Sequence, residues 1–130
     1  MILGIGTDLI INSRVKKLYA KYGERFVKKI LSADEKAEFY NLKSSKKLNF
    51  LCSSFAAKEA LVKAFGLGFR GIYPTDISMQ KNELGKPELI NVKLDNVKHH
   101  LSITITDTVS YTHLRAHETV LDLVCRLLLE

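Results

Sequence analysis

Apolar residues between positions 46 and 65 recur at the spacing of an α-helix, and the segment contains no Gly or Pro. The residues that form this stripe are Leu48, Leu51, Cys52, Phe55 and Val62. Ser44 or Ser45 can start the helix, and Gly66 can end it. The pattern therefore predicts one long helix in the middle of the chain.

One charged side chain, that of Glu59, falls inside the apolar stripe of this helix, since successive residues are about 100° apart. Burying an ionised carboxylate costs several kcal/mol unless it is paired or binds a metal. Lys63 follows four residues later, which favours an ion pair on one helix face. An ordinary surface pair of this kind would contribute only about 0.3–0.5 kcal/mol. We therefore expect either a cationic partner for Glu59 or a functional site on this face.

The rest of the chain predicts shorter elements on both sides of the long helix. Residues 2–11 are apolar and β-branched, which is typical of a strand. Asn12 or Ser13 can cap the next helix, whose apolar stripe consists of Val15, Leu18, Tyr19, Tyr22 and Phe26. Residues 32–35 form a capping box that opens a helix to about Leu42.

The second half of the chain predicts strands. Residues 76–81 and 87–92 flank a turn sequence at 82–86 and predict a hairpin, and residues 101–106 alternate like a further strand. Most helices precede the strands, so the pattern favours an α+β fold over a parallel βαβ sheet.

Composition and charge narrow the functional classes. With 130 residues, 46% hydrophobic and 26% charged, the chain suits one compact domain. No apolar run reaches membrane-spanning length, no signal peptide is evident and the two cysteines lack metal-ligand spacing, so we expect a cytoplasmic protein. The net charge of +6 is concentrated between Arg14 and Lys29, where seven basic residues face Glu24 alone. This segment predicts nucleic acid, anionic lipid or an acidic protein as partner, or else a solvated helix face.

A second carboxylate, Asp8, ends the apolar stretch that begins the chain. The sequence Gly4-Ile-Gly6-Thr-Asp8 lacks the third glycine of a dinucleotide-binding fingerprint. Asp8 could be a simple strand-end residue. Together with Glu59 it could instead hold Mg²⁺, which takes one or two protein carboxylates and fills its shell with water and substrate phosphates. A lysine beside such a site, Lys63, suits a phosphate-bearing substrate.

The C-terminal segment has an unusual sequence. Residues 110–119 and 123–130 match the in-frame translation of a sequencing-library adapter. We therefore expect the domain to comprise residues 1–108 and residues 109–130 to be a non-native, adapter-derived tail, which is excluded from reasoning about the fold.

Three motifs occur in order: residues 4–8, the sequence Phe-Ala-Ala-Lys-Glu-Ala at 55–60, and Glu-Leu-Gly-Lys-Pro at 83–87. In this combination, residues 1–108 resemble the holo-acyl-carrier-protein synthases, the small class of 4′-phosphopantetheinyl transferases. The resemblance implies an α+β fold in which a small, mostly antiparallel sheet packs against a long central helix. It also implies a homotrimer with its sites at the subunit interfaces.

The resemblance further implies an activity: transfer of 4′-phosphopantetheine from coenzyme A to a serine of an apo-acyl carrier protein, with Mg²⁺ as cofactor. It makes Asp8 and Glu59 the metal ligands and Asp8, Glu59 and Lys63 the catalytic residues. The residues expected to bind coenzyme A are Lys46, Lys47, Lys58, Lys63, Gly66 and Gly68. The residues expected to dock the acidic carrier protein are Arg14, Lys17, Lys21, Arg25 and Phe26.

Two positions depart from the family pattern, and one competing function is kept open. Ser54 stands where the family commonly has a basic residue, and Leu67 replaces the threonine of a Gly-Thr-Gly loop, so we expect weaker coenzyme A binding with the same class of reaction. The resemblance predicts neither nucleic acid nor a membrane as partner. The alternative is a non-catalytic basic module that binds RNA or an acidic protein, which explains the basic helix but not Asp8 and Glu59.

Overall fold

The computed structural model describes residues 4–66, 68, 70–90 and 120–121. Its helices are α1 (Asn12–Tyr22), α2 (Glu24–Ile30), α3 (Ala33–Asn41), α4 (Ser44–Phe65) and the short 3₁₀ helix η1 (Pro74–Asp76). Its strands are β1 (Ile10–Ile11), β2 (Ser78–Lys81), β3 (Pro87–Ile90) and β4 (Val120–Leu121). The fold is α+β, as predicted.

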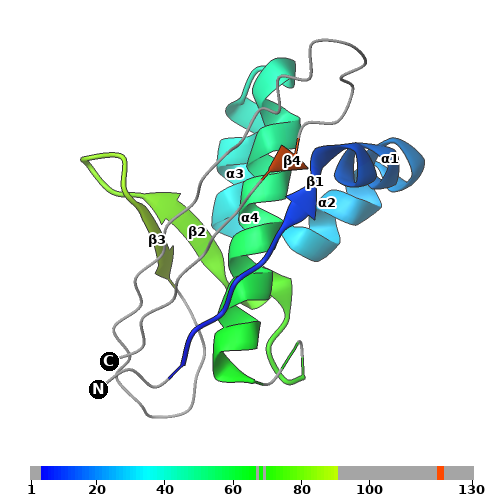
Figure 1. Ribbon diagram of the computed structural model, residues 1–130. Helices are drawn as coiled ribbons and strands as arrows, with labels where there is room; N and C mark the ends of the chain where they lie inside the picture. Colours follow the sequence, from blue (N-terminus) through cyan, green and yellow to red (C-terminus); the bar gives the residue numbers. More distant parts are fainter. Residues whose placement is uncertain (1–3, 67, 69, 91–119, 122–130) are drawn as a thin grey trace.

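The long helix α4 is the central element of the fold (Figure 1), with α1, α2 and β2 in contact with it. It begins at Ser44 and ends at Gly66, whose φ of 70° is the left-handed conformation that glycine adopts most easily. The predicted long helix is therefore confirmed.

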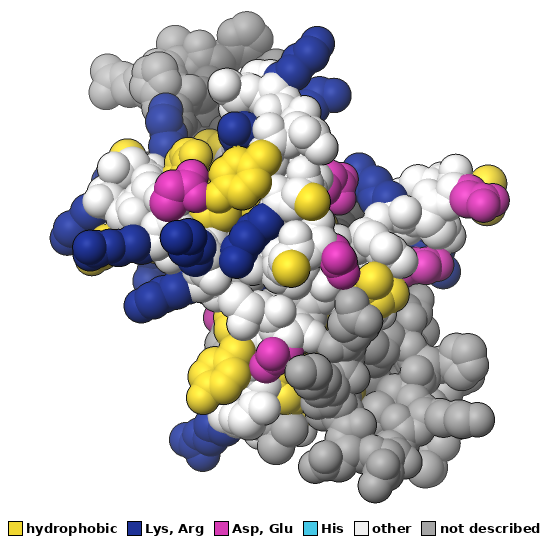
Figure 2. All heavy atoms as spheres, turned by 180° about the vertical axis from the view of Figure 1, so that it is seen from behind, with side chains coloured by type: hydrophobic (Ala, Val, Ile, Leu, Met, Phe, Trp, Pro, Cys, Tyr) yellow, Lys and Arg dark blue, Asp and Glu magenta, His cyan; other side chains and the backbone are white. Residues whose placement is uncertain are grey.

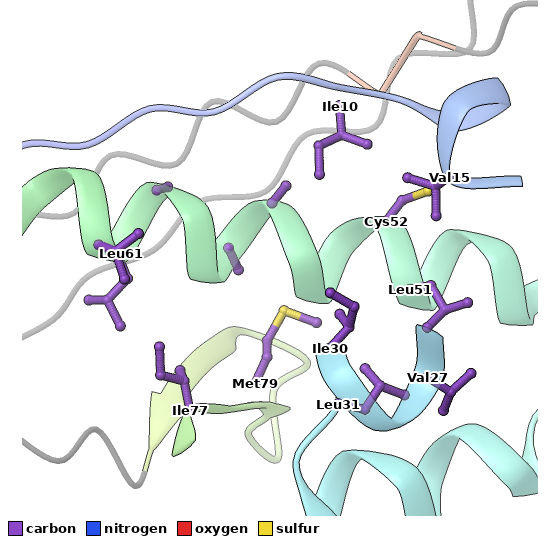
Figure 3. Packing of buried hydrophobic residues seen from close by; sticks show 14 of the residues in the cluster. Ile10, Val15, Val27, Ile30, Leu31, Leu51, Cys52, Leu61, Ile77 and Met79 are labelled. Atoms are coloured by element: carbon purple, nitrogen blue, oxygen red, sulfur yellow. The ribbon is translucent and has the colours of Figure 1, made fainter. Parts of the chain in front are cut away.

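The hydrophobic core lies on both sides of α4 (Figure 3). Ile10 packs on one side, while Ile30, Ile77 and Met79 approach from the other. Small residues of α4 are completely buried between these two layers: Ala56, Ala57 and Ala60. A helix that is covered on two sides leaves only a narrow strip for solvent, and Glu59 lies in such a partly exposed position.

The strands form two antiparallel pairs. In one pair, β2 and β3 are joined by a turn in which the Asn82 side chain accepts hydrogen bonds from the backbone amides of Leu84 and Lys86. This confirms the predicted hairpin. In the other pair, β1 lies beside β4, with Ile10 opposite Leu121. Within the described residues, no helix is both long and apolar enough to cross a membrane.

The capping box at the start of α3 is also confirmed. The Ser32 hydroxyl accepts a hydrogen bond from the Glu35 amide, and the Glu35 carboxylate accepts one from the Ser32 amide at 3.0 Å. These reciprocal bonds satisfy two amides that a helix start leaves unpaired. They also fix the Glu35 carboxylate in a buried position.

The structure corrects three predictions. The strand expected over residues 2–11 is limited in the described part of the chain to Ile10 and Ile11. The apolar stripe from Val15 to Phe26 predicted one helix, but the helix is divided at Gly23, whose φ of 53° breaks the helical path. Asn12 is the first residue of α1 and not its cap. The predicted strand at 101–106 and the predicted domain boundary at residue 108 lie outside the described residues.

Candidate metal and phosphate site

The site depends on a close approach between the N-terminal segment and α4. Gly6 is buried, and a Cβ atom on it would lie 1.9 Å from the Ala60 carbonyl oxygen and 2.6 Å from the Ala64 amide nitrogen. Both neighbours are backbone atoms of α4, so no side-chain movement could relieve this clash. Only glycine therefore lets this segment lie directly on the helix, and Asp8 follows two residues later.

The close approach brings Asp8 to Lys63. The Lys63 ammonium lies 2.8 Å from the Asp8 Oδ1 and 3.2 Å from the Thr7 carbonyl oxygen. The Asp8 side chain is only 11% exposed, whereas that of Lys63 is 52% exposed. The ion pair therefore links residues that are 55 positions apart in the sequence, and Lys63 still reaches solvent.

Glu59 joins the same cluster. Burial raises the pKa of the Glu59 carboxyl, the Asp8 carboxylate raises it further, and Lys63 lowers it. The structure thus brings together the three residues that the sequence analysis selected, Asp8, Glu59 and Lys63. The Asp8 carboxylate disfavours the charge on Glu59, and a cation bound between the two carboxylates would relieve this repulsion.

This carboxylate pair fits magnesium. Among the described residues, no group of three or more His, Cys, Asp or Glu side chains is placed to hold a metal ion. Mg²⁺ does not need such a group, because it commonly uses one or two carboxylates and completes its octahedron with water and substrate phosphates. Asp8 and Glu59 match this donor set, and Lys63 adds a positive charge at the edge of the site.

Two glycines that were predicted to bind coenzyme A, Gly66 and Gly68, lie just after the C-terminal end of α4. Gly66 caps the helix three residues after Lys63, and both Gly66 and Gly68 are exposed with positive φ. They lie at the same end of α4 as Glu59 and Lys63. The position of Leu67 is outside the described residues.

The structure does not bring Lys46 and Lys47 to this cluster. Twelve residues separate Lys47 from Glu59 along a straight helix, which corresponds to about 18 Å at 1.5 Å per residue. The Lys47 ammonium instead lies over the Phe39 ring, 5.1 Å from its centroid. Any contact between these lysines and coenzyme A must therefore be made far from Glu59.

Lys58 occupies a different place from the one expected. Its side chain is completely buried, forms an ion pair with Glu35 and donates a hydrogen bond of 2.6 Å to the Ile30 carbonyl. Burial lowers the pKa of Lys58, and the nearby Glu35 carboxylate opposes this effect. A fully enclosed ammonium is not accessible to coenzyme A, so we replace its predicted binding role with a structural one.

Glu35 is the buried residue whose importance the sequence analysis missed. The capping-box pattern was the only sign of Glu35 in the sequence. That pattern does not show that the carboxylate faces the interior of the protein. Ser54, noted as a departure from the family pattern, is also fully buried and donates a hydrogen bond to Glu35.

The expected docking residues lie on α1 and α2. The side chains of Arg14, Lys17, Lys21 and Arg25 are exposed, whereas Phe26 packs partly against the core. Figure 2 shows Lys and Arg side chains gathered on the side of the molecule that carries these two helices. We call Arg14, Lys17, Lys21 and Arg25 the basic surface.

Comparisons with known proteins decide the family. A family model described as the 4′-phosphopantetheinyl transferase superfamily matches residues 4–118. The chain belongs to this superfamily. It is 45% identical over 108 residues to a holo-[acyl-carrier-protein] synthase of Wigglesworthia glossinidia brevipalpis, covering 79% of this chain and 78% of that protein. It is 40% identical over 107 residues to the synthase of Bacillus subtilis, covering 82% and 88% respectively.

Solved structures of phosphopantetheinyl transferases share the fold. The chain is 30% identical to the Neisseria meningitidis holo-[acyl-carrier-protein] synthase, with a TM-score of 0.79 over 100% of this chain and 99% of that one. It is also 30% identical to the Bacillus anthracis synthase, solved in complex with CoA (3′,5′-ADP), with a TM-score of 0.77 over 100% and 97%. The predicted family and fold class are thereby confirmed.

Replacing Gly6 with Ala should separate the N-terminal segment from α4. The added methyl group cannot fit against the Ala60 carbonyl, so we expect a loss of about 1–3 kcal/mol in the free energy of unfolding, measured with urea. Thr7→Ala changes an exposed neighbour and should stay within about 0.5 kcal/mol of the wild type. A Gly6→Ala variant as stable as Thr7→Ala would contradict the close approach.

Replacing Glu59 with Gln should stabilise the protein at neutral pH. The pKa of Glu59 is raised in the folded chain, so the folded chain holds the proton of this carboxyl group more tightly than the unfolded chain does. Wild-type stability should therefore fall as the pH rises from the usual glutamate range through the raised pKa, and Glu59→Gln should not show this loss. Thermal melts across that pH range test this, with Glu38→Gln, exposed on α3, as the control. The same pH dependence in Glu59→Gln and the wild type would refute it.

Proposed function

We propose that this protein transfers 4′-phosphopantetheine from coenzyme A to a serine of an apo-acyl carrier protein and releases adenosine 3′,5′-bisphosphate. The carrying observation is the cluster of Asp8, Glu59 and Lys63, which joins the first two sequence motifs in space. The names of the relatives support the same reaction, since they are holo-[acyl-carrier-protein] synthases. The basic module that only binds a partner gives no reason for two carboxylates in one half-buried site.

In the proposed reaction, the serine hydroxyl oxygen attacks the β-phosphorus of the coenzyme A pyrophosphate. A new oxygen–phosphorus bond forms, the bond to the bridging oxygen breaks, and adenosine 3′,5′-bisphosphate leaves with the electron pair. Asp8 and Glu59 would hold Mg²⁺, which when bound neutralises charge on the phosphate oxygens. Mg²⁺ dependence is part of this proposal.

Lys63 and Glu59 would contribute directly. Lys63 is half exposed and carries a long flexible side chain, so its ammonium can turn from Asp8 to a phosphate oxygen. The Glu59 carboxylate lies in the same cluster as Asp8 and Lys63 and would accept the serine proton as the oxygen–phosphorus bond forms. Positioning of the two substrates supplies much of the remaining acceleration.

The basic surface would dock the carrier protein. Its four exposed cations lie on α1 and α2, and α1 begins four residues after Asp8. A partner with an acidic surface is attracted to such a patch, which raises the rate of encounter and fixes its orientation. Because the connection from Asp8 to α1 is short, a partner docked on the basic surface would lie close to the carboxylates.

We also propose a homotrimer as the working assembly. Three apolar side chains on the N-terminal segment are exposed, Ile5, Leu9 and Ile11, and such patches favour contact with another protein surface. Sedimentation equilibrium would contradict the trimer if it found single chains only.

The direct test is the transfer itself. Incubation with coenzyme A, Mg²⁺ and an apo-carrier protein should add one phosphopantetheine to the carrier, detected by intact-protein mass spectrometry, and removal of Mg²⁺ should stop it. Glu59→Gln should lower the rate roughly 100-fold or more, because a metal ligand contributes several kcal/mol to the transition state. Glu38→Gln should behave like the wild type. No mass gain with the wild type would favour the non-catalytic module.

Reversing charges on the basic surface should weaken docking without altering the chemistry. For Lys21→Glu/Arg25→Glu we expect the KM for the carrier protein to rise about tenfold while kcat changes little, with a smaller difference at high salt. Lys81→Glu/Lys86→Glu, which reverses two exposed cations of the β2–β3 hairpin, serves as a charge-matched control. An equal change of KM in the control would refute docking at the basic surface.

A further inference from the structure

A second cluster of polar side chains lies buried beside α4 and plays no part in the proposed reaction. We call it the buried polar cluster; its members are Ser32, Glu35, Ser54, Lys58 and Ser78. These residues come from the start of α3, from α4 and from β2. The exposed fraction is at most 5% for each of them, so the cluster is closed to solvent.

The Glu35 carboxylate is the centre of the buried polar cluster. One of its oxygens accepts from the Ser32 amide and from Lys58, and the other accepts from the Ser54 hydroxyl. Ser78 on β2 donates to the Ser32 hydroxyl at 2.7 Å. Lys58 also donates to the carbonyl of Ile30, the last residue of α2. The pair of charges thus ties α4 to α2 and α3, and the bond from Ser78 to Ser32 joins β2 to the same cluster.

Stability alone gives a weak reason for this arrangement. Removing two charges from water costs several kcal/mol per ion, and replacing a buried ion pair with apolar residues of similar volume is often neutral or stabilising. What the ion pair supplies is one fixed orientation of α4 about its axis. Hydrogen bonds require one orientation, whereas apolar packing tolerates several. Around Lys58 the buried neighbours on α4 are the small Ala56, Ala57 and Ala60, and the larger buried side chains of the helix, Leu51, Leu61 and Val62, make apolar contacts without hydrogen-bond direction.

The orientation of α4 about its axis matters for the site because Lys58 immediately precedes Glu59 in the helix. Lys58 is bonded on the side of α2 and α3, and Lys63 is bonded to Asp8 on the side of the N-terminal segment. A rotation of α4 by about 10° would move a carboxylate at the helix surface by on the order of 1 Å. Misplacement of that size can lower a reaction rate about 100-fold.

We propose that Glu35 and Lys58 are positioning residues that set the rotation of α4, so that Glu59 and Lys63 meet Asp8 in the geometry that holds Mg²⁺ and the phosphate. This proposal rests on the proposed function. It assigns Lys58 no contact with coenzyme A. It also links α2, which carries Arg25 of the basic surface, to the helix that carries the proposed metal ligand Glu59.

The test replaces the ion pair with an uncharged pair of similar volume, Glu35→Gln/Lys58→Met. We expect the variant to fold with a thermal midpoint close to that of the wild type, because no charge is left unpaired. We expect its Mg²⁺ affinity, measured by calorimetry with coenzyme A present, to weaken about tenfold. We also expect kcat for transfer to fall at least tenfold, while the KM for the carrier protein changes less than about twofold.

A matched control separates positioning from general weakening of the fold. Val27→Ala removes buried volume from α2 without touching the buried polar cluster, so it should lower the thermal midpoint and leave the Mg²⁺ affinity unchanged. If the double variant fails to fold, Ser54→Ala is tested in place of it. This change removes one hydrogen bond from Glu35, and we expect a two- to threefold loss of Mg²⁺ affinity.

The outcomes distinguish this inference from the proposed function. Equal Mg²⁺ affinity in the folded variant and the wild type, including no binding by either, would overturn the positioning role. Weakening of the same size in Val27→Ala would overturn it as well. If the wild type binds Mg²⁺ but transfers no phosphopantetheine, the proposed function fails and the positioning role is decided by the affinities alone.

Discussion

The contact between Gly6 and the backbone of α4 is the constraint on which the site depends. A Cβ at this position would lie within 3 Å of two backbone atoms of α4, Ala60 O and Ala64 N, so the approach is possible only for glycine. Because Asp8 follows after one further residue, this contact places its carboxylate beside Lys63 and near Glu59. A charge that would be costly on an ordinary apolar face thereby becomes half of a carboxylate pair suited to a cation.

The helix α4 makes two kinds of polar contact, on different sides. Toward α2 and α3 it contributes Lys58 to the buried polar cluster, and toward the N-terminal segment it contributes Glu59 and Lys63 to the site. The apolar layers on both sides hold α4 in place, and the hydrogen bonds of Lys58 and Glu35 add a fixed direction to this packing. Directional bonds at one side can therefore set the geometry at the other.

Local patterns predicted the elements well, because each depends on neighbours in the sequence. The capping box at Ser32, the helix end at Gly66 and the 82–86 turn were all readable in this way. The placement of Glu59 on an apolar stripe and the resemblance together also selected Asp8 and Lys63. Tertiary contacts were harder: the sequence did not reveal that Lys58 is enclosed with Glu35, and a short helical stripe concealed the break at Gly23. Lys46 and Lys47 lie on the same helix as Glu59, but the length of helix between them keeps these two lysines away from the site.

The central claim is that Asp8 and Glu59 act together as the ligands of one cation. A double-mutant cycle on Mg²⁺ affinity tests it most directly, with Asp8→Asn, Glu59→Gln and the double variant compared by calorimetry in the presence of coenzyme A. If both carboxylates hold the same ion, either single change should lower the affinity nearly as much as the double change does. Independent, additive losses, or unchanged affinity in either single variant, would contradict the shared site.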